Sequence, residues 1–167
     1  PPGRFSLITG IKNCLIIDSS YNASKAPMIA ALNFLANIKE RKRIAVLGDM
    51  RELGKEAESQ HQAVAERAIK SADLIILTGP LMKKYFLPHA LKLGFDKANI
   101  FWFNSSKKVG IFLRETIKSG EIILVKGSQN NIFLERAIEE IMAEPEKKKD
   151  ILCRQSTYWQ KIKNNNF

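Results

Sequence analysis

The sequence predicts an α/β fold, with a Rossmann-like, mostly parallel sheet flanked by helices, and three observations support this prediction. Short apolar runs recur at residues 5–8, 14–17, 44–47, 74–77, 100–103 and 122–125. The runs are continuous, which is typical of strands that are buried on both faces of a parallel sheet. Between the later runs, apolar residues are spaced by three and four, as on one face of a helix.

The first run is a possible antiparallel strand. Only the turn at residues 9–13, which contains Gly10, separates it from the second run. So short a connection suits a hairpin, whereas two parallel neighbours need a long crossover. From the second run onward, strands alternate with helices, which indicates right-handed βαβ units.

Four helices are predicted, each with one apolar face toward the sheet. We also expect the aromatic run at residues 101–103 to be buried in the sheet. The apolar faces of the four helices comprise Met28, Ala31, Leu32 and Leu35; Ala63, Val64 and Ala68; Val109, Phe112, Leu113 and Ile117; and Phe133, Leu134, Ala137, Ile138 and Ile141.

The 167 residues suffice for one domain and a tail. A charge run around Pro145 divides a domain at residues 1–145 from a basic tail at residues 146–167. The tail holds six Lys or Arg and two acidic residues, and so carries +4 of the net charge of +10. It could pack back as a short strand or helix, or extend freely.

Several classes of protein are disfavoured by the composition. No apolar run is long enough to span a bilayer and no signal pattern is present, so we expect a cytoplasmic protein without membrane insertion. Two cysteines, Cys14 and Cys153, cannot build a disulfide framework or a multi-cysteine zinc site, and no metal ligands are predicted. The nearest approach to a phosphate-binding Walker loop has Glu56 where a hydroxyl is needed.

Polar loops after two buried strands are the candidate binding segments, because ligands of open parallel sheets gather beyond the carboxyl ends of the strands. Asp18 ends one strand, and Tyr21 and Asn22 follow it. A carboxylate there can accept ribose hydroxyls, although a helix cap with a turn would use the same residue types. After residues 122–125, Lys126 and Gly127 could form an anion site at the start of the last helix, and again a simple cap by Ser128 or Asn130 is an alternative.

Five ordered motifs resemble the C-terminal domain of the Mur ligases, and the third points to the MurF type. The resemblance covers residues 1–145. In chain order the motifs are PPGRF, LIIDSSYNAS, IAVLGDMRELG, ESQHQAV and ILVKGSQNNIFLERA.

The resemblance implies an ATP-dependent amide (peptide) ligase of peptidoglycan precursor synthesis. In this family a peptide carboxylate becomes an acyl phosphate, which the amine of D-alanyl-D-alanine attacks. The C-terminal domain closes over ATP and presents the amine. Its implied partners are the enzyme's own N-terminal and central domains, the UDP-N-acetylmuramoyl peptide and D-alanyl-D-alanine. Mg²⁺ would be held mainly by the central domain, so the isolated fragment is expected to be inactive.

The resemblance also implies roles for single residues. Arg4 and Lys126 are the expected catalytic residues, and Arg4 together with Asp18, Tyr21 and Asn22 would bind ATP. His61 is expected to play a structural role, through a hydrogen bond that holds its loop. The expected substrate-binding residues are Asp49, Gly127 and Ser128.

Three departures from the family pattern bear on these roles. Ser19 replaces a second acid, Ser24 and Lys25 replace Asn-Pro, and Gln129 stands where the family often has Arg. The last change leaves the identity of the amine open. Two alternatives also remain: a basic α/β module that binds nucleic acid, because of the net charge, and a Rossmann-like interaction domain without catalysis.

Overall fold

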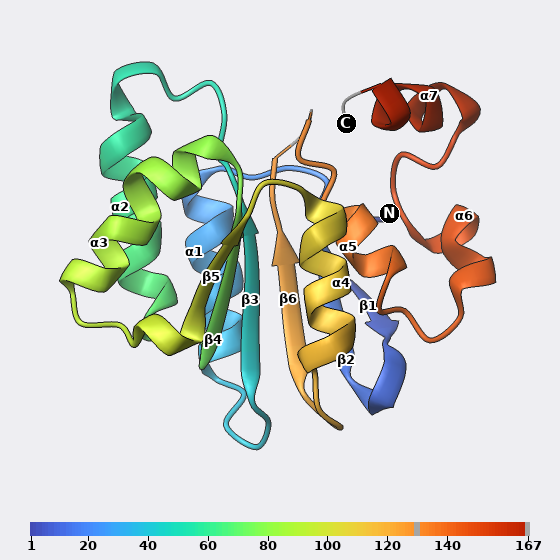
Figure 1. Ribbon diagram of the computed structural model, residues 1–167, viewed down its shortest axis with the longest axis horizontal. Helices are drawn as coiled ribbons and strands as arrows, with labels where there is room; N and C mark the ends of the chain where they lie inside the picture. Colours follow the sequence, from blue (N-terminus) through green and yellow to red (C-terminus); the bar gives the residue numbers. More distant parts are fainter. Residues whose placement is uncertain (129–130, 166–167) are drawn as a thin grey trace.

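The computed structural model describes residues 1–128 and 131–165. Its centre is a six-stranded sheet with the strand order β1-β2-β6-β3-β4-β5 (Figure 1). β1 pairs antiparallel with β2, and the four other pairings are parallel, so the predicted sheet and its antiparallel first strand are confirmed. The strands are β1 (Ser6–Thr9), β2 (Leu15–Ser19), β3 (Arg43–Gly48), β4 (Leu74–Thr78), β5 (Ile100–Phe103) and β6 (Ile122–Lys126).

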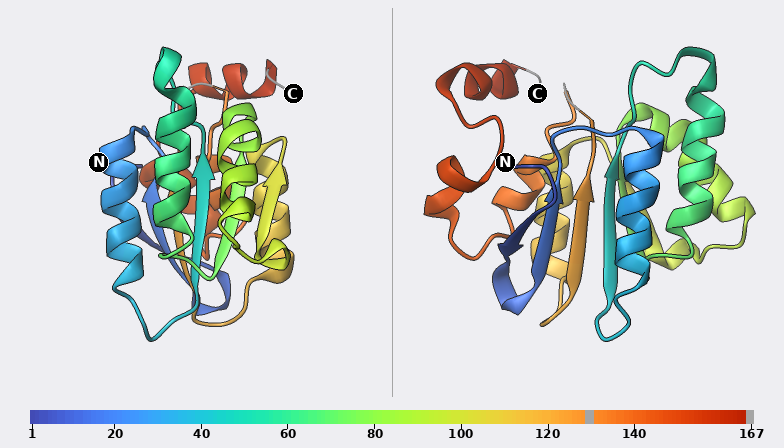
Figure 2. Two further views of the ribbon diagram at one scale, coloured as in Figure 1. Left: turned by 90° about the vertical axis from the view of Figure 1, so that its left-hand side faces the viewer. Right: turned by 180° about the vertical axis from the view of Figure 1, so that it is seen from behind.

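Helices cover both faces of this sheet (Figures 1 and 2). One core unites α1, α2 and α3 with one face, and a second core unites α4 and α5 with the other. No described helix is long and apolar enough to cross a membrane. The helices are α1 (Lys25–Ala36), α2 (Ala57–Ala68), α3 (Leu87–Lys92), α4 (Ser106–Thr116), α5 (Glu135–Glu139), α6 (Lys148–Ile151) and α7 (Thr157–Asn165).

The apolar runs are continuous because each central strand contributes side chains to both hydrophobic cores. Successive side chains of a strand point to opposite faces. Ile17 therefore packs in the core with α1, while its neighbour Ile16 packs in the core with α4. In β3, Ala45 likewise packs in the core with α1, and Val46 packs in the core with α4.

Two predictions about the elements were wrong in part. The last helix begins at Glu135 and not near Phe133. Phe133 has φ 46°, a left-handed conformation that cannot continue into an α-helix. Phe101 and Phe103 are only partly buried, because β5 is an edge strand; both rings pack against Phe112 instead.

The basic tail packs back onto the domain as helices α6 and α7, which is one of the two alternatives that the sequence left open. Figures 1 and 2 show both helices on the β1 side of the molecule, near the N-terminus. Leu152, Cys153 and Arg154 are buried. The division of the chain at residue 145 stays a prediction.

Candidate functional site

A crevice forms at the carboxyl ends of β2 and β6. The register of these parallel neighbours sets Ser19 opposite Lys126, each the last residue of its strand. The chain then leaves β2 toward α1 on one face and leaves β6 toward α5 on the other. Neighbouring strands whose loops diverge in this way create the switch point at which α/β sheets bind ligands.

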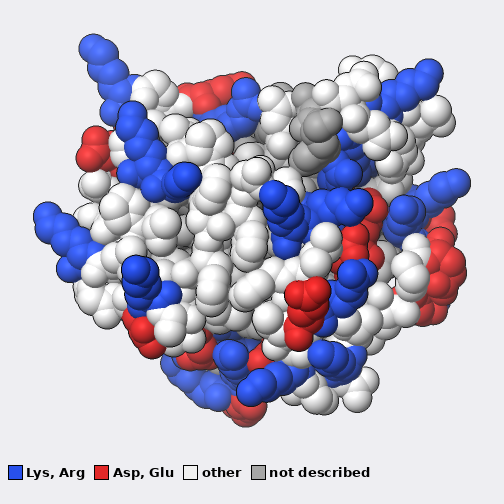
Figure 3. Space-filling model, viewed as in Figure 1, with Lys and Arg blue, Asp and Glu red and all other residues white. Residues whose placement is uncertain are grey.

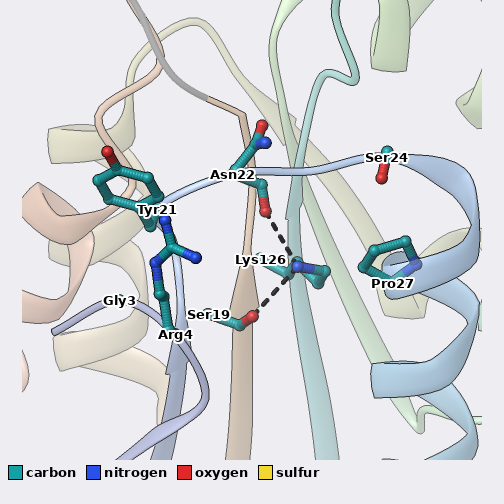
Figure 4. A pocket seen from close by; sticks show the side chains of 8 residues that line it. All are labelled: Gly3, Arg4, Ser19, Tyr21, Asn22, Ser24, Pro27 and Lys126. Carbon is teal, nitrogen blue, oxygen red and sulfur yellow. Dashed lines mark hydrogen bonds between the residues drawn. The ribbon is translucent and has the colours of Figure 1, made fainter. Parts of the chain in front are cut away.

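A pocket of about 340 Å³ occupies this crevice (Figure 4), a volume typical of small-molecule sites. It joins segments that are far apart in the sequence: the N-terminal segment, the loop between β2 and α1, and the end of β6. Four of the predicted site residues contribute to its wall. The lining residues are Gly3, Arg4, Ser19, Tyr21, Asn22, Ser24, Pro27 and Lys126.

Lys126 is a buried cation at the base of this pocket. Its Nζ donates to Ser19 Oγ at 3.1 Å and to the Asn22 carbonyl at 3.0 Å. An ammonium has three hydrogens, so these two bonds leave one for a ligand. Burial lowers the pKa of Lys126 to about 8, although the nearby Asp18 opposes the shift. The side chain is therefore charged at neutral pH and attracts anions.

Arg4 forms another part of the wall. Its guanidinium carbon lies 4.6 Å from the centroid of the Tyr21 ring. The guanidinium is exposed and has no hydrogen-bond or ion-pair partner among the described residues, so its five N–H groups remain for a ligand. The neighbouring Gly3 accepts a hydrogen bond from Tyr21 N at 3.0 Å, which ties the N-terminal segment to the loop.

Glycine is favoured at position 3. Gly3 has φ 74°, and a Cβ there would lie 3.1 Å from both Tyr21 Cβ and Cys153 Sγ. The sequence offered Gly3 only as part of the PPGRF motif, and its packing role was not predicted. The wall residues Ser24 and Pro27 were not predicted either.

Asp18 lies beneath the pocket, where it is fully buried and does not line the cavity. Its Oδ1 accepts a hydrogen bond from Ser20 N at 3.0 Å, which forms the local turn that was the alternative interpretation of this residue. Burial raises the pKa of Asp18, although the Ser20 hydrogen bonds oppose the shift. A direct contact between Asp18 and a ribose is not available in this conformation, because the carboxylate is covered.

Asp49, Gly127 and Ser128 do not line the pocket. Asp49 accepts hydrogen bonds from Leu81 N at 3.1 Å and Met82 N at 2.8 Å, so its carboxylate closes the turn that follows β4. Burial raises the pKa of Asp49, and these two bonds oppose that rise.

Among the described residues, Gly127 and Ser128 do not stand at the start of the last helix, where the sequence predicted an anion site. Gly127 and Ser128 are buried, and α5 begins seven positions beyond Ser128. A Cβ at position 127 would lie 2.5 Å from Leu134 Cδ1, so a larger residue there would displace the end of the Leu134 side chain. Gln129 and Asn130, which the sequence also singled out, lie outside the described residues.

His61 has the structural role that the sequence predicted. Its Nε2 accepts a hydrogen bond from Met50 N at 3.2 Å, and its Nδ1 lies 2.6 Å from the Ala57 carbonyl. Burial lowers the pKa of His61, which favours the neutral ring. The neutral tautomer with hydrogen on Nδ1 satisfies both contacts.

The described residues do not suit a magnesium site. Within residues 1–128 and 131–165, no group of three or more His, Cys, Asp and Glu side chains is placed to hold a metal ion.

Comparison with known proteins identifies the family. The model described as "Mur ligase, glutamate ligase domain" matches residues 3–129. The UDP-N-acetylmuramoyl-tripeptide--D-alanyl-D-alanine ligase of Escherichia coli is 34% identical over 141 residues, which are 83% of this chain and 30% of that protein. The ligase of the same name from Synechocystis is 28% identical over 144 residues, 86% of this chain and 31% of the relative.

A solved structure has the same fold. The MurF ligase from Thermotoga maritima in complex with ADP has a TM-score of 0.66 and 26% identity, covering 89% of this chain and 32% of its own. The chain thus spans about a third of the length of the relatives that it matches. Because the family model covers most of the sequence, the chain belongs to the Mur ligase family, as a C-terminal domain of the MurF type.

Proposed function

We propose that this chain is the domain that closes over ATP and presents the amine in a ligase that joins D-alanyl-D-alanine to a UDP-N-acetylmuramoyl peptide. The reaction belongs to peptidoglycan precursor synthesis, and its place is the cytoplasm. Support comes from the names of the relatives and from the Thermotoga maritima MurF ligase, whose structure is a complex with ADP.

The observation that carries this proposal is the pairing of Arg4 and Lys126 across one pocket. Arg4 offers a planar set of donors to phosphate oxygens, and Lys126 adds a point charge. Both charges would oppose the negative charge that develops during phosphoryl transfer. Tyr21 and Asn22, on the same wall, offer a ring face and an amide to the nucleoside.

The roles that we propose for the remaining residues are based on the family relation, because these residues do not line the pocket. Asp18 would shape the nucleotide loop from beneath. Asp49, Gly127 and Ser128 would support the side on which the amine enters. The N-terminal and central domains would hold the UDP-linked peptide, the triphosphate and Mg²⁺.

A nucleic-acid module is not favoured. Figure 3 shows Lys and Arg dispersed over one face and its edges, with acidic residues among them. Nucleic-acid binding by charge requires a continuous basic patch or stripe. The family match and the pocket also disfavour an interaction domain without catalysis.

The test is to measure ATP-dependent ligation of D-alanyl-D-alanine to the UDP-linked tripeptide, with phosphate release recorded in parallel. We expect the 167-residue chain alone to be inactive, and the chain joined to the two preceding ligase domains to be active. Arg4→Ala in the joined protein should abolish most of the activity. Ligation by the chain alone, or full activity of the Arg4→Ala protein, would overturn the proposal.

A further inference from the structure

A buried ion cluster joins the C-terminal segment to α5. Glu135 on α5 is fully buried. Arg154 Nε donates to its Oε1 at 3.0 Å, and Arg154 Nη2 donates to its Oε2 at 2.7 Å. Lys163 Nζ lies 2.9 Å from the same Oε1 as an ion pair, without the geometry of a hydrogen bond. Buried charges are costly without well-placed partners, so this cluster fixes the C-terminal segment against the domain.

Arg154 also contacts the loop that lines the pocket. Its Nη2 donates to the Ser20 carbonyl at 2.9 Å, and its Nη1 donates to the Tyr21 carbonyl at 3.1 Å. The guanidinium carbon lies 5.6 Å from the Tyr21 ring centroid. The rigid plane of five donors makes four hydrogen bonds here, two to Glu135 and two to consecutive carbonyls, which is one more than the three hydrogens of an ammonium allow.

The backbone at Arg154 supports a positioning role. Arg154 has φ 54°, a left-handed conformation that is uncommon for any residue other than glycine. Such strained residues persist only where the surrounding structure holds them, and they cluster at functional sites. The preceding Cys153 lies against the same loop, with its Sγ 3.7 Å from Ser20 Oγ.

Movement of this loop would alter both cations of the pocket. Tyr21 carries the ring against which Arg4 rests, and the carbonyl of Asn22 accepts a hydrogen bond from Lys126. The family match ends at residue 129, so the C-terminal segment lies beyond the part that the family model describes.

We propose that the C-terminal segment, residues 152–163, holds loop 20–22 in its pocket-lining conformation, and that Arg154 is a positioning residue for nucleotide binding. The inference rests on the proposed nucleotide role of Tyr21 and Asn22. Arg154 itself does not line the pocket, so it acts through the loop.

The matched pair Arg154→Lys and Lys163→Gln tests this inference in the 167-residue chain. Both changes disturb the partners of Glu135, but only Arg154 bonds to the loop. Two quantities are measured at a temperature at which all variants are folded: the Kd for ADP by calorimetry, and amide hydrogen exchange of residues 20–23. Arg154→Lys should weaken ADP binding about tenfold and speed exchange in the loop. Lys163→Gln should leave both within about twofold.

Equal effects of the two variants, or unchanged loop exchange in Arg154→Lys, would overturn the inference. If the unaltered chain fails to bind ADP, the proposed function of the pocket fails, and hydrogen exchange alone then decides whether Arg154 holds the loop. If Arg154→Lys does not fold, the triple variant Glu135→Gln, Arg154→Gln, Lys163→Gln replaces it, since it removes all three charges of the buried cluster. The same faster exchange in the loop is expected.

Discussion

Two acidic residues, Asp18 and Asp49, occupy similar positions in the sequence, at the end of a buried strand, but their carboxylates have different hydrogen-bond partners. Each stands at or just after the carboxyl end of a buried strand, and burial raises the pKa of each. Both oxygens of Asp49 accept backbone N–H groups, from Leu81 and Met82. Asp18 uses only Oδ1, and its Oδ2 has no hydrogen-bond partner among the described residues.

The difference lies in what the neighbouring elements supply. Asp49 follows β3, and the turn after the neighbouring β4 donates two backbone N–H groups to its carboxylate. These bonds occupy both oxygens of the carboxylate. Beside Asp18, the N-terminal segment and β6 contribute Arg4 and Lys126 and leave a cavity. Polar groups that are already satisfied stabilise a fold, whereas polar groups left exposed in a cavity can bind a ligand.

The largest expected effect is the loss of stability in Asp49→Ala. The change leaves the buried N–H of Met82 and the partly buried N–H of Leu81 without acceptors, and we expect the free energy of unfolding to fall by about 3 kcal/mol. Urea unfolding measures it. Asp49→Asn keeps one acceptor oxygen and serves as the control with a smaller loss. A stability loss in Asp49→Ala below about 1 kcal/mol would show that these bonds do not close the turn.

Arg4→Ala should show the opposite behaviour. The side chain is exposed, so we expect the stability to change by less than about 0.5 kcal/mol. The affinity for ADP should fall about 30-fold, since charge-assisted hydrogen bonds to phosphate contribute about 2 kcal/mol. Calorimetry measures the affinity. Arg114→Ala, which removes a surface cation remote from the pocket lining, is the matched control and should bind normally.

Because Lys126 loses its charge near pH 8, we predict that ADP binding depends on pH. The pKa of about 8 in the folded chain means that the ammonium loses its proton as the pH rises through 8. We expect the affinity to fall by up to about tenfold between roughly pH 7 and 9, because the pocket loses one cation. Lys126→Met should lack this step, so the comparison removes the titration of ADP itself. The same pH profile in both proteins would exclude Lys126 from the site.

Lys126 also makes the free energy of unfolding depend on pH. A lysine in an ion pair, whose pKa is raised, loses stability as the pH rises, and Lys126 should show the opposite trend. Its pKa is lowered from 10.5 on folding, so the unfolded chain binds more protons between pH 8 and 10.5. Relative to Lys126→Met, the unaltered protein should therefore gain stability as the pH rises through this window. Urea unfolding at several pH values measures the gain, and a relative loss would contradict the burial of a charged Lys126.

The smallest expected effect on binding is that of Asp18→Asn. The carboxylate lies beneath the pocket, and Asn retains the oxygen that accepts from Ser20 N, so the affinity for ADP should stay within about twofold. Burial raises the pKa of Asp18, so the folded chain binds its proton more tightly than the unfolded chain does. That contribution to stability is present at acid pH and is lost as the pH rises, and Asp18→Asn should lack it. A large loss of affinity would place Asp18 in contact with the nucleotide.

Local patterns were sufficient to predict the sheet and the main helices. Continuous apolar runs reveal strands buried on both faces, as Ile16 and Ile17 show. The start of the last predicted helix depends on tertiary packing instead: Phe133 takes a left-handed conformation that no local propensity signals. The short helices of the tail carry too few apolar residues to be recognised by spacing alone.

The lining of the pocket was predicted in part for a similar reason. Arg4, Tyr21, Asn22 and Lys126 were named from ordered motifs. The register between β2 and β6 sets the loop after β2 beside Lys126, and the hydrogen bond between Tyr21 and Gly3 holds the segment of Arg4 against that loop. Arg154 carried no signal in the sequence, because its partners Ser20 and Glu135 are distant along the chain. The two hydrogen bonds that Asp49 accepts could not be predicted either, because their donors, Leu81 and Met82, are more than thirty positions away in the sequence.

Residue-resolved NMR of the chain during an ADP titration tests the central claim most directly, namely that the carboxyl ends of β2 and β6 form the nucleotide site. We expect the shifts to change at Arg4, Tyr21, Asn22 and Lys126, and to stay constant at Asp49 and Leu81. Changes centred on Asp49, or a pocket whose signals do not respond to ADP, would contradict the account.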